Sequence, residues 1–168
     1  VLVLEKMLRP MAGGSSRITG GIFATPVDKT RSSVEAYIDD LMMKSENRAD
    51  RELIRVFVEH SFDVVEWLKG LGVLFEPPVY LWPPYRFGGH ILSPGLYLGS
   101  ETCIEILIAE SQKRGIQFRF ETRARSLILD SKGCVNGVRA SGVDGMIDFK
   151  AKATVIATGG WAANRGMV

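Results

Sequence analysis

Short apolar runs near both ends of the chain predict strands of a parallel sheet. Residues 1–4 and 153–157 are continuous runs of Val, Leu, Ile, Ala and Thr, a pattern typical of strands buried on both faces. Residues 116–120 alternate apolar with polar side chains and predict another strand. Three further segments separated by turn residues predict an antiparallel meander: 126–130, 134–140 and 146–150.

Between these strands, apolar residues recur at helical spacing and predict three helices, over residues 32–45, 50–70 and 100–113. Ser32 or Ser33 can cap the first helix and Asp50 the second, because these side chains accept bonds from free backbone N–H groups. Residues 75–98 are rich in Pro, Gly and aromatic side chains and predict a long loop, which in a compact domain is often a binding element.

Composition and charge exclude several classes of protein. The chain has 168 residues, of which 46% are hydrophobic and 24% charged, which is typical of one globular domain. A net charge of +2 is too small to indicate a nucleic-acid partner. No apolar run approaches the roughly 20 residues of a membrane span. Two cysteines, Cys103 and Cys134, predict reduced thiols in a cytoplasmic protein.

Three motifs near the predicted parallel strands are candidates for binding a ligand. Glu5 ends the first strand, where a dinucleotide-binding fold places a carboxylate on the ribose hydroxyls; a surface Glu is the alternative. In Gly13–Gly21, paired glycines flank Ser, Arg and Thr, so the backbone can approach a flat ring or a phosphate, unless the segment is a flexible surface loop. Residues 157–160, Ala-Thr-Gly-Gly, follow an apolar strand and either contact a ligand or form a simple turn.

His90 is the candidate catalytic residue of the long loop, where it follows Gly88 and Gly89. A structural role is the alternative, because a lone histidine is more often part of the packing. The sequence has no Ser-His-Asp pattern and no zinc-ligand spacing, so neither hydrolysis by a triad nor metal binding is indicated.

The order of these motifs resembles the FAD-binding domain of the succinate dehydrogenase/fumarate reductase flavoprotein family, over nearly the whole chain. Ala-Thr-Gly-Gly with the meander before it is the most specific part, and Gly-Gly-x-Ser-Arg-x-Thr with Gly-Gly-His is most similar to the soluble tricarballylate dehydrogenase branch. The resemblance implies an α/β fold: a partial Rossmann-like FAD-binding domain with a parallel sheet, a helical insertion and an antiparallel meander. Residues 1–30 and 116–168 would form its dinucleotide-binding core, and 31–115 the helical and loop insertion.

The resemblance also implies a cofactor and the residues that hold it. No His lies between Gly13 and Gly21, where membrane-complex members attach FAD, so FAD would be bound non-covalently. Glu5 would bind the adenosine ribose, and the backbone of Ala124 would contact adenine. The other implied cofactor-binding residues line the pyrophosphate and isoalloxazine (Gly13, Gly14, Ser15, Ser16, Arg17, Thr19, Gly20 and Gly21) or the adenosine diphosphate end (Ala157, Thr158, Gly159 and Gly160).

The activity implied is that of a FAD-dependent oxidoreductase acting on the CH–CH group of a di- or tricarboxylate such as tricarballylate, fumarate or succinate. A small carboxylate would be its substrate, and an electron-transfer protein a possible partner. The alternatives are an aspartate oxidase-like or ketosteroid dehydrogenase-like flavoprotein of the same fold, or an inactive remnant that only binds. The family's first phosphate loop and its capping domain would lie outside Val1–Val168, so we expect a fragment that is inactive by itself.

Overall fold

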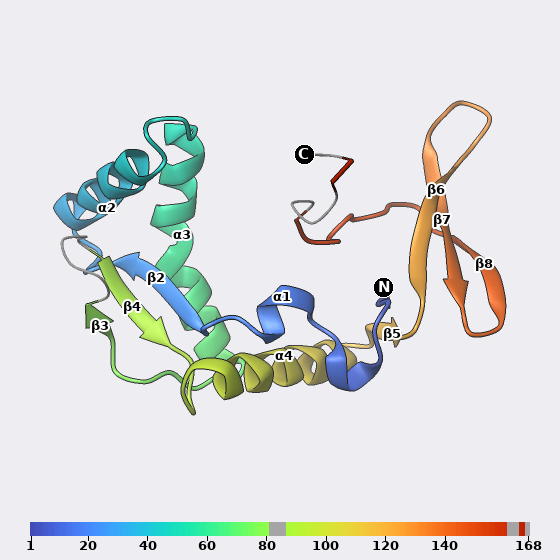
Figure 1. The fold of residues 1–168 in the computed structure, drawn as a ribbon, viewed down its shortest axis with the longest axis horizontal. Helices are drawn as coiled ribbons and strands as arrows, with labels where there is room; N and C mark the ends of the chain where they lie inside the picture. Colours follow the sequence, from blue (N-terminus) through green and yellow to red (C-terminus); the bar gives the residue numbers. More distant parts are fainter. Residues whose placement is uncertain (81–86, 161–164, 167–168) are drawn as a thin grey trace. The chain divides into compact units, whose positions relative to one another are not determined.

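The chain folds into two compact units, seen in a computed structural model that describes residues 1–80, 87–160 and 165–166 (Figure 1). The first unit combines both ends of the chain, Val1–Ser15 and Ser111–Val168. The second unit is the middle of the chain, Ser16–Glu110. Residues close to Val1 therefore pack with residues more than a hundred positions away.

A parallel strand pair and an antiparallel meander make up the first unit. β1 (Leu2–Leu4) and β5 (Gln117–Arg119) pair in parallel with Val3 opposite Phe118, which confirms this part of the predicted parallel sheet. The meander is confirmed as a three-stranded sheet of β6 (Arg123–Leu129), β7 (Val135–Gly142) and β8 (Gly145–Lys150). At Gly137 of β7 a Cβ would collide with the carbonyl oxygen of Phe149, so this position requires glycine.

The prediction of a strand over residues 153–157 is wrong. No residue of this run is in a strand, and no described strand pairs with it. The Val155 and Ile156 side chains are 89% and 66% exposed. An apolar run becomes a buried strand only where a neighbouring strand accepts and donates its backbone hydrogen bonds, and the apolar pattern alone does not supply that neighbour.

The second unit contains a sheet that the sequence pattern did not predict. β2 (Ile22–Pro26), β4 (Phe87–Ile91) and β3 (Val79–Tyr80) are antiparallel in the order β2-β4-β3. The expected loop over residues 75–98 therefore holds two strands, and Phe75 and Leu92 form an isolated bridge. The local signal was misleading because β4 contains Gly88 and Gly89, and glycine is depleted in strands unless another backbone comes close.

Three long helices were expected and three are present: α2 (Arg31–Lys44), α3 (Arg51–Gly70) and α4 (Leu96–Lys113). Asp50 caps α3 as predicted, since its carboxylate accepts the N–H groups of Glu52 and Leu53 at 2.9 and 3.1 Å. The predicted cap of α2 is wrong by two or three residues, because Thr30 is the cap and accepts the Ser33 N–H at 3.3 Å. Two short turns complete the elements: η1 (Arg9–Met11) and α1 (Gly14–Arg17).

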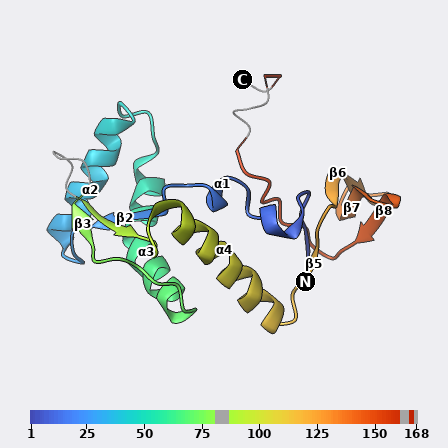
Figure 2. The same cartoon turned by 60° about the horizontal axis from the view of Figure 1, so that its bottom comes forward.

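The core of the second unit lies where α2 and α3 pack on β2, as Figures 1 and 2 both show. Ile38 of α2 and Val58 of α3 are both 0% exposed and pack together with Tyr37. Burial, and to a lesser extent the nearby charge of Asp40, raises the pKa of Tyr37 to about 12, so its hydroxyl is neutral at physiological pH. A second cluster joins the end of α3 to the start of α4 through Leu68, Val73, Leu92 and Cys103.

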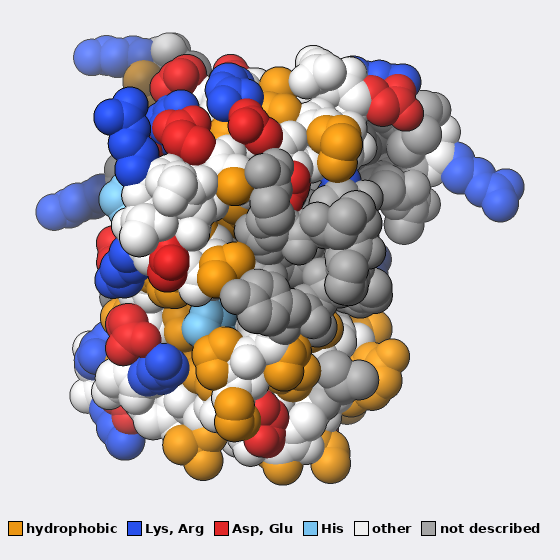
Figure 3. Space-filling view, turned by 90° about the vertical axis from the view of Figure 1, so that its left-hand side faces the viewer, with side chains coloured by type: hydrophobic (Ala, Val, Ile, Leu, Met, Phe, Trp, Pro, Cys, Tyr) orange, Lys and Arg blue, Asp and Glu red, His pale blue; other side chains and the backbone are white. Residues whose placement is uncertain are grey.

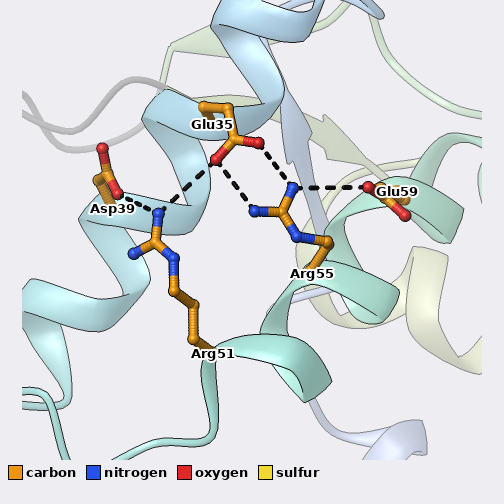
Figure 4. A network of polar contacts seen from close by, with 5 residues as sticks. All are labelled: Glu35, Asp39, Arg51, Arg55 and Glu59. Carbon is orange, nitrogen blue, oxygen red and sulfur yellow. Dashed lines mark hydrogen bonds and ion pairs between the residues drawn. The ribbon is translucent and has the colours of Figure 1, made fainter.

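A network of charged side chains also links α2 to α3 (Figure 4). Arg55 of α3 donates two hydrogen bonds to the Glu35 carboxylate of α2, at 2.6 and 3.2 Å, and these bonds hold the pKa of Glu35 below its ordinary value. Arg51 reaches Asp39 at 2.7 Å and Glu35 at 3.6 Å. These side chains are partly exposed, and ion pairs between exposed side chains add little to the free energy of unfolding. The main effect of the network is therefore on the orientation of α2 relative to α3.

The surface carries both apolar and mixed-charge areas. Figure 3 shows acidic and basic side chains side by side on one face, next to exposed apolar ones, which agrees with the small net charge of +2. On α3 the exposed apolar side chains follow a helical spacing and include Leu53, Phe57, Val64 and Trp67. None of the described helices combines the length and the apolar character needed to cross a membrane.

Candidate functional site

The end of the parallel strand pair places Glu5 beside the turn that leads to Ala124. Glu5 N–H donates to Arg119 O at 2.9 Å, and Thr122 N–H donates to Glu5 O at 2.9 Å. The Glu5 carboxylate accepts the Met7 N–H at 2.8 Å, so its orientation is fixed by its own backbone. The structure thus brings Glu5 to Thr122, at the strand ends where α/β proteins bind ligands. Ala124 was predicted to lie in a turn, but it is the second residue of β6 and pairs with Ala140.

A hollow of about 420 Å³ opens at these strand ends, a volume suited to a small ligand or to part of a larger one. Its walls combine apolar side chains with three basic ones and one acidic one, and include Lys6, Met7, Met11, Glu121, Arg123, Arg125 and Val143. Apolar groups can cover a flat ring, and three cationic side chains attract a phosphate. None of these residues was predicted as a site residue. The available signal was position in the sequence: Lys6 and Met7 directly follow Glu5, and Arg123 and Arg125 flank Ala124.

The Gly-rich segment changes its surroundings along its length. Gly13 and Gly14 have positive φ angles of 108° and 54°, which other residues rarely adopt, and nothing lies within 4 Å of where a Gly14 Cβ would be. Ser15 and Ser16 are exposed and lie in α1, which begins at Gly14. The first part of the segment therefore presents Gly14 and two serine side chains to the solvent, and its contact with a cofactor stays a prediction.

Arg17 is held by two carboxylates of α4. Its guanidinium donates to Glu101 at 2.6 Å and to Glu105 at 2.9 Å, and only 10% of its side chain is exposed. Burial lowers the pKa of Arg17, but the hydrogen bonds that it donates to Glu105 and Glu101, together with their charges, outweigh this effect, and the net shift is upward. The structure gives Arg17 a clear role in fixing the segment, and its contact with a cofactor stays a prediction.

The Ala157–Gly160 segment is exposed and does not line the hollow. Gly159 has a positive φ of 80°, a conformation that favours glycine, but residues 157–160 form no assigned turn or bend, so the alternative of a simple turn is not confirmed. The structure does not bring these four residues to Glu5, and their predicted contact with the adenosine diphosphate end stays a prediction.

His90 is a buried residue of the second unit. It is 7% exposed, its Nε2 lies 3.1 Å from Thr25 Oγ1, and the rings of Phe62 and Phe75 meet it edge to face. Burial, assisted by the charge of Lys69, lowers the pKa of His90, so the imidazole is neutral at physiological pH. This geometry favours the structural alternative, in which His90 completes the packing of β2 against β4.

Lowering the pH should destabilise the second unit through His90. Because the folded-state pKa of His90 lies below the ordinary value of 6.5, the unfolded chain takes up the proton first as the pH falls. The free energy of unfolding is therefore expected to fall between about pH 8 and about pH 5. Urea unfolding of the wild type and of His90→Gln tests this, with His60→Gln on the exposed side of α3 as control. An unchanged pH dependence in His90→Gln would contradict the assignment.

Comparison with known proteins identifies the family to which the chain belongs. The sequence pattern of the FAD binding domain family matches residues 1–167, so the chain belongs to that family. It is 29% identical over 175 residues to a fumarate reductase (cytochrome) of Shewanella frigidimarina, covering all of this chain and 30% of the relative. It is also 30% identical over 178 residues to a urocanate reductase of Eggerthella lenta, covering 98% of this chain and 28% of the relative.

The fold agrees with this assignment. The open conformation of a flavocytochrome c3 fumarate reductase superposes with a TM-score of 0.84 at 28% identity, covering 99% of this chain and 30% of that chain. The predicted α/β FAD-binding fold, with its parallel strands, helices and antiparallel strands, is therefore confirmed. The chain spans about three-tenths of the length of these relatives. The division into a core (1–30 and 116–168) and an insertion (31–115) stays a prediction.

The residues present fit FAD, the cofactor of this family. Glu5 holds a carboxylate at the strand end, where it can accept hydrogen bonds from a ribose diol. The adjacent hollow offers both apolar and cationic walls, which suit an adenine ring linked to phosphate. The positive φ angles of Gly13 and Gly14 leave room for close backbone approach.

Proposed function

We propose that the whole protein is a FAD-dependent oxidoreductase that transfers a hydride to or from the carbon–carbon bond beside a carboxylate. The observation that carries the proposal is the match to the FAD-binding family over residues 1–167 together with the fixed carboxylate of Glu5. Bound FAD would supply the hydride chemistry, and the chain would supply orientation and charge stabilisation.

Each part of FAD can be assigned to residues that the sequence predicts as cofactor-binding. Glu5 would bind the adenosine ribose, and the hollow beside Ala124 would take the adenine. The Gly-rich segment would bind the pyrophosphate and isoalloxazine, and the Ala157–Gly160 segment the adenosine diphosphate end. We propose non-covalent attachment, because no His lies between Gly13 and Gly21.

The substrate we propose is a di- or tricarboxylate. Relatives named fumarate reductase, urocanate reductase and acrylate reductase support reduction of a small unsaturated carboxylate. The proposal of tricarballylate rests only on the Gly-Gly-x-Ser-Arg-x-Thr form and the Gly-Gly-His motif. A relative named L-aspartate oxidase, 27% identical over 179 residues, favours an aspartate oxidase-like activity as the second candidate.

A partner that transfers electrons is part of the proposal, supported by the cytochrome in the name of the first relative. The cytoplasmic location stays a prediction from the two cysteines.

Cofactor binding and activity are tested separately. FAD is titrated into the purified protein, and the quenching of flavin fluorescence reports binding; release of all flavin on acid precipitation reports non-covalent attachment. Activity is then measured with fumarate, succinate, tricarballylate and L-aspartate, using an artificial electron donor or acceptor. Failure to bind FAD would contradict the cofactor role of this chain. Binding without turnover of any of the four in the full-length protein would instead support the binding-only alternative.

A further inference from the structure

Ser100 lies beneath the Gly-rich segment and fastens its backbone. Ser100 is only 1% exposed, whereas Thr19 is exposed. The Ser100 hydroxyl donates to Thr19 O at 3.0 Å, and the two hydroxyl oxygens lie 3.2 Å apart. Thr19 Oγ1 in turn accepts the Gly21 N–H at 3.2 Å. One buried side chain therefore fixes the Thr19 carbonyl directly and the Gly21 amide through Thr19.

The end of the segment is fixed by a backbone contact on the same side. Leu92 N–H donates to Gly21 O at 2.8 Å. The helix α4 approaches Leu92 so closely that a Cβ at Gly99 would lie 2.5 Å from the Leu92 carbonyl oxygen. Glycine at position 99 thus lets α4 come near enough for Ser100 to reach Thr19.

The start of the segment is fixed by charge. Glu101 and Glu105 are one helical turn apart on α4 and both accept hydrogen bonds from Arg17. The inner side of residues 17–21 is therefore bonded at both ends to α4 and Leu92. Its outer side is open, since Ile18, Thr19 and Gly20 are exposed. A segment held on one side and open on the other is suited to receive a ligand without first becoming ordered.

We propose that Ser100 is a positioning residue for the cofactor, which with Glu101 and Glu105 holds residues 17–21 in the backbone conformation that receives FAD. The inference rests on the proposed function, in which the Gly-rich segment binds the flavin. It also gives α4 a role, since this helix supports the Gly-rich segment through the side chains of Ser100, Glu101 and Glu105. Residues that touch no cofactor would then set its affinity.

The test compares Ser100→Ala with Ser61→Ala. Ser61 is a matched control because it is also buried, at 8% exposed, and donates a similar hydrogen bond to Val58 O at 2.7 Å, but in α3 and away from the Gly-rich segment. Two quantities are measured: amide hydrogen exchange of peptides covering residues 17–22 in the FAD-free protein, and the rate of FAD release from the loaded protein. Ser100→Thr, which keeps the hydroxyl, serves as the rescue variant.

Ser100→Ala is expected to raise both the exchange rate and the FAD release rate about fivefold, the effect of losing one neutral hydrogen bond. Ser100→Thr should restore both rates, and Ser61→Ala should leave both unchanged although it also removes a buried bond. Unchanged exchange in Ser100→Ala would overturn the proposed clamp. Faster exchange with unaltered FAD release would show that the clamp is structural only. Absence of FAD binding by the wild type would instead count against the proposed function.

Discussion

Replacing Glu5 with Ala should weaken FAD binding about 10- to 100-fold, which corresponds to the loss of a hydrogen bond to a charged group. The Glu5 carboxylate is held at the end of β1 by the Met7 N–H, at 2.8 Å, so it needs no rearrangement to accept bonds from a ribose diol. Alanine removes both the acceptor and its charge. Titration of FAD into wild type and variant, followed by flavin fluorescence, measures the change in Kd.

Two further variants separate the binding role of Glu5 from its role in the fold. Glu5→Gln keeps an amide oxygen that can accept the Met7 N–H, and we expect an intermediate loss of affinity because the charge is gone. Glu76→Ala removes an exposed carboxylate in the second unit and should leave the Kd unchanged. Equal FAD affinity in Glu5→Ala and wild type would contradict the assignment of Glu5 to the ribose.

The elements that could be predicted from the sequence are those whose signals are local. The apolar spacing of α3 and the Asp50 cap lie within a few residues of each other, and both are as expected. The meander was predicted from the turn residues between its strands, which include Gly133 and Gly145, and both glycines have the positive φ that such turns require. In each case, the residues that decide the structure are neighbours along the chain.

The elements that could not be predicted depend on distant partners. β4 is a strand because β2, more than sixty residues earlier, pairs with it, with Ala24 opposite Gly89. Residues 153–157 have a good strand composition but no described strand beside them. Both runs, 1–4 and 153–157, were predicted to be strands buried on both faces. Only the first pairs with a described strand, and it is not buried either, since Val1 and Leu2 are 92% and 41% exposed.

The residues of the candidate site likewise fall into two groups, those with a local sequence signal and those that depend on distant partners. Glu5 and Ala124 each follow a segment predicted to be a strand, but the pairing of those strands, with Val3 opposite Phe118, was not predicted. Ser100 and Glu105 could not be anticipated, because they meet Thr19 and Arg17 across 81 and 88 residues of chain. A serine and a glutamate within a predicted helix give no sign of such a contact. Residues that position a site are harder to predict than those that carry its motif.

Replacing Ile38 with Ala should lower the free energy of unfolding of the second unit by about 2–5 kcal/mol, the usual cost of removing a large buried aliphatic side chain. Ile38 is 0% exposed and packs with Val58 and Tyr37, so it touches the three elements α2, α3 and β2 through one cluster. Alanine would leave a cavity that the surrounding helices can fill only in part. Urea unfolding followed by far-UV circular dichroism reports this unit, because α2 and α3 lie within it.

Met43→Ala on the same helix is the matched control, since Met43 is 57% exposed and its loss should change the free energy of unfolding by less than about 0.5 kcal/mol. Comparable destabilisation by the two substitutions would mean that Ile38 is not in the core.

Ile38→Ala is also expected to affect the Gly-rich segment of the candidate site. Thr25 and His90 lie on the sheet that this cluster supports, and Gly21 directly precedes β2. If the cluster holds that sheet in place, Ile38→Ala should also raise hydrogen exchange in residues 17–22, whereas Met43→Ala should not.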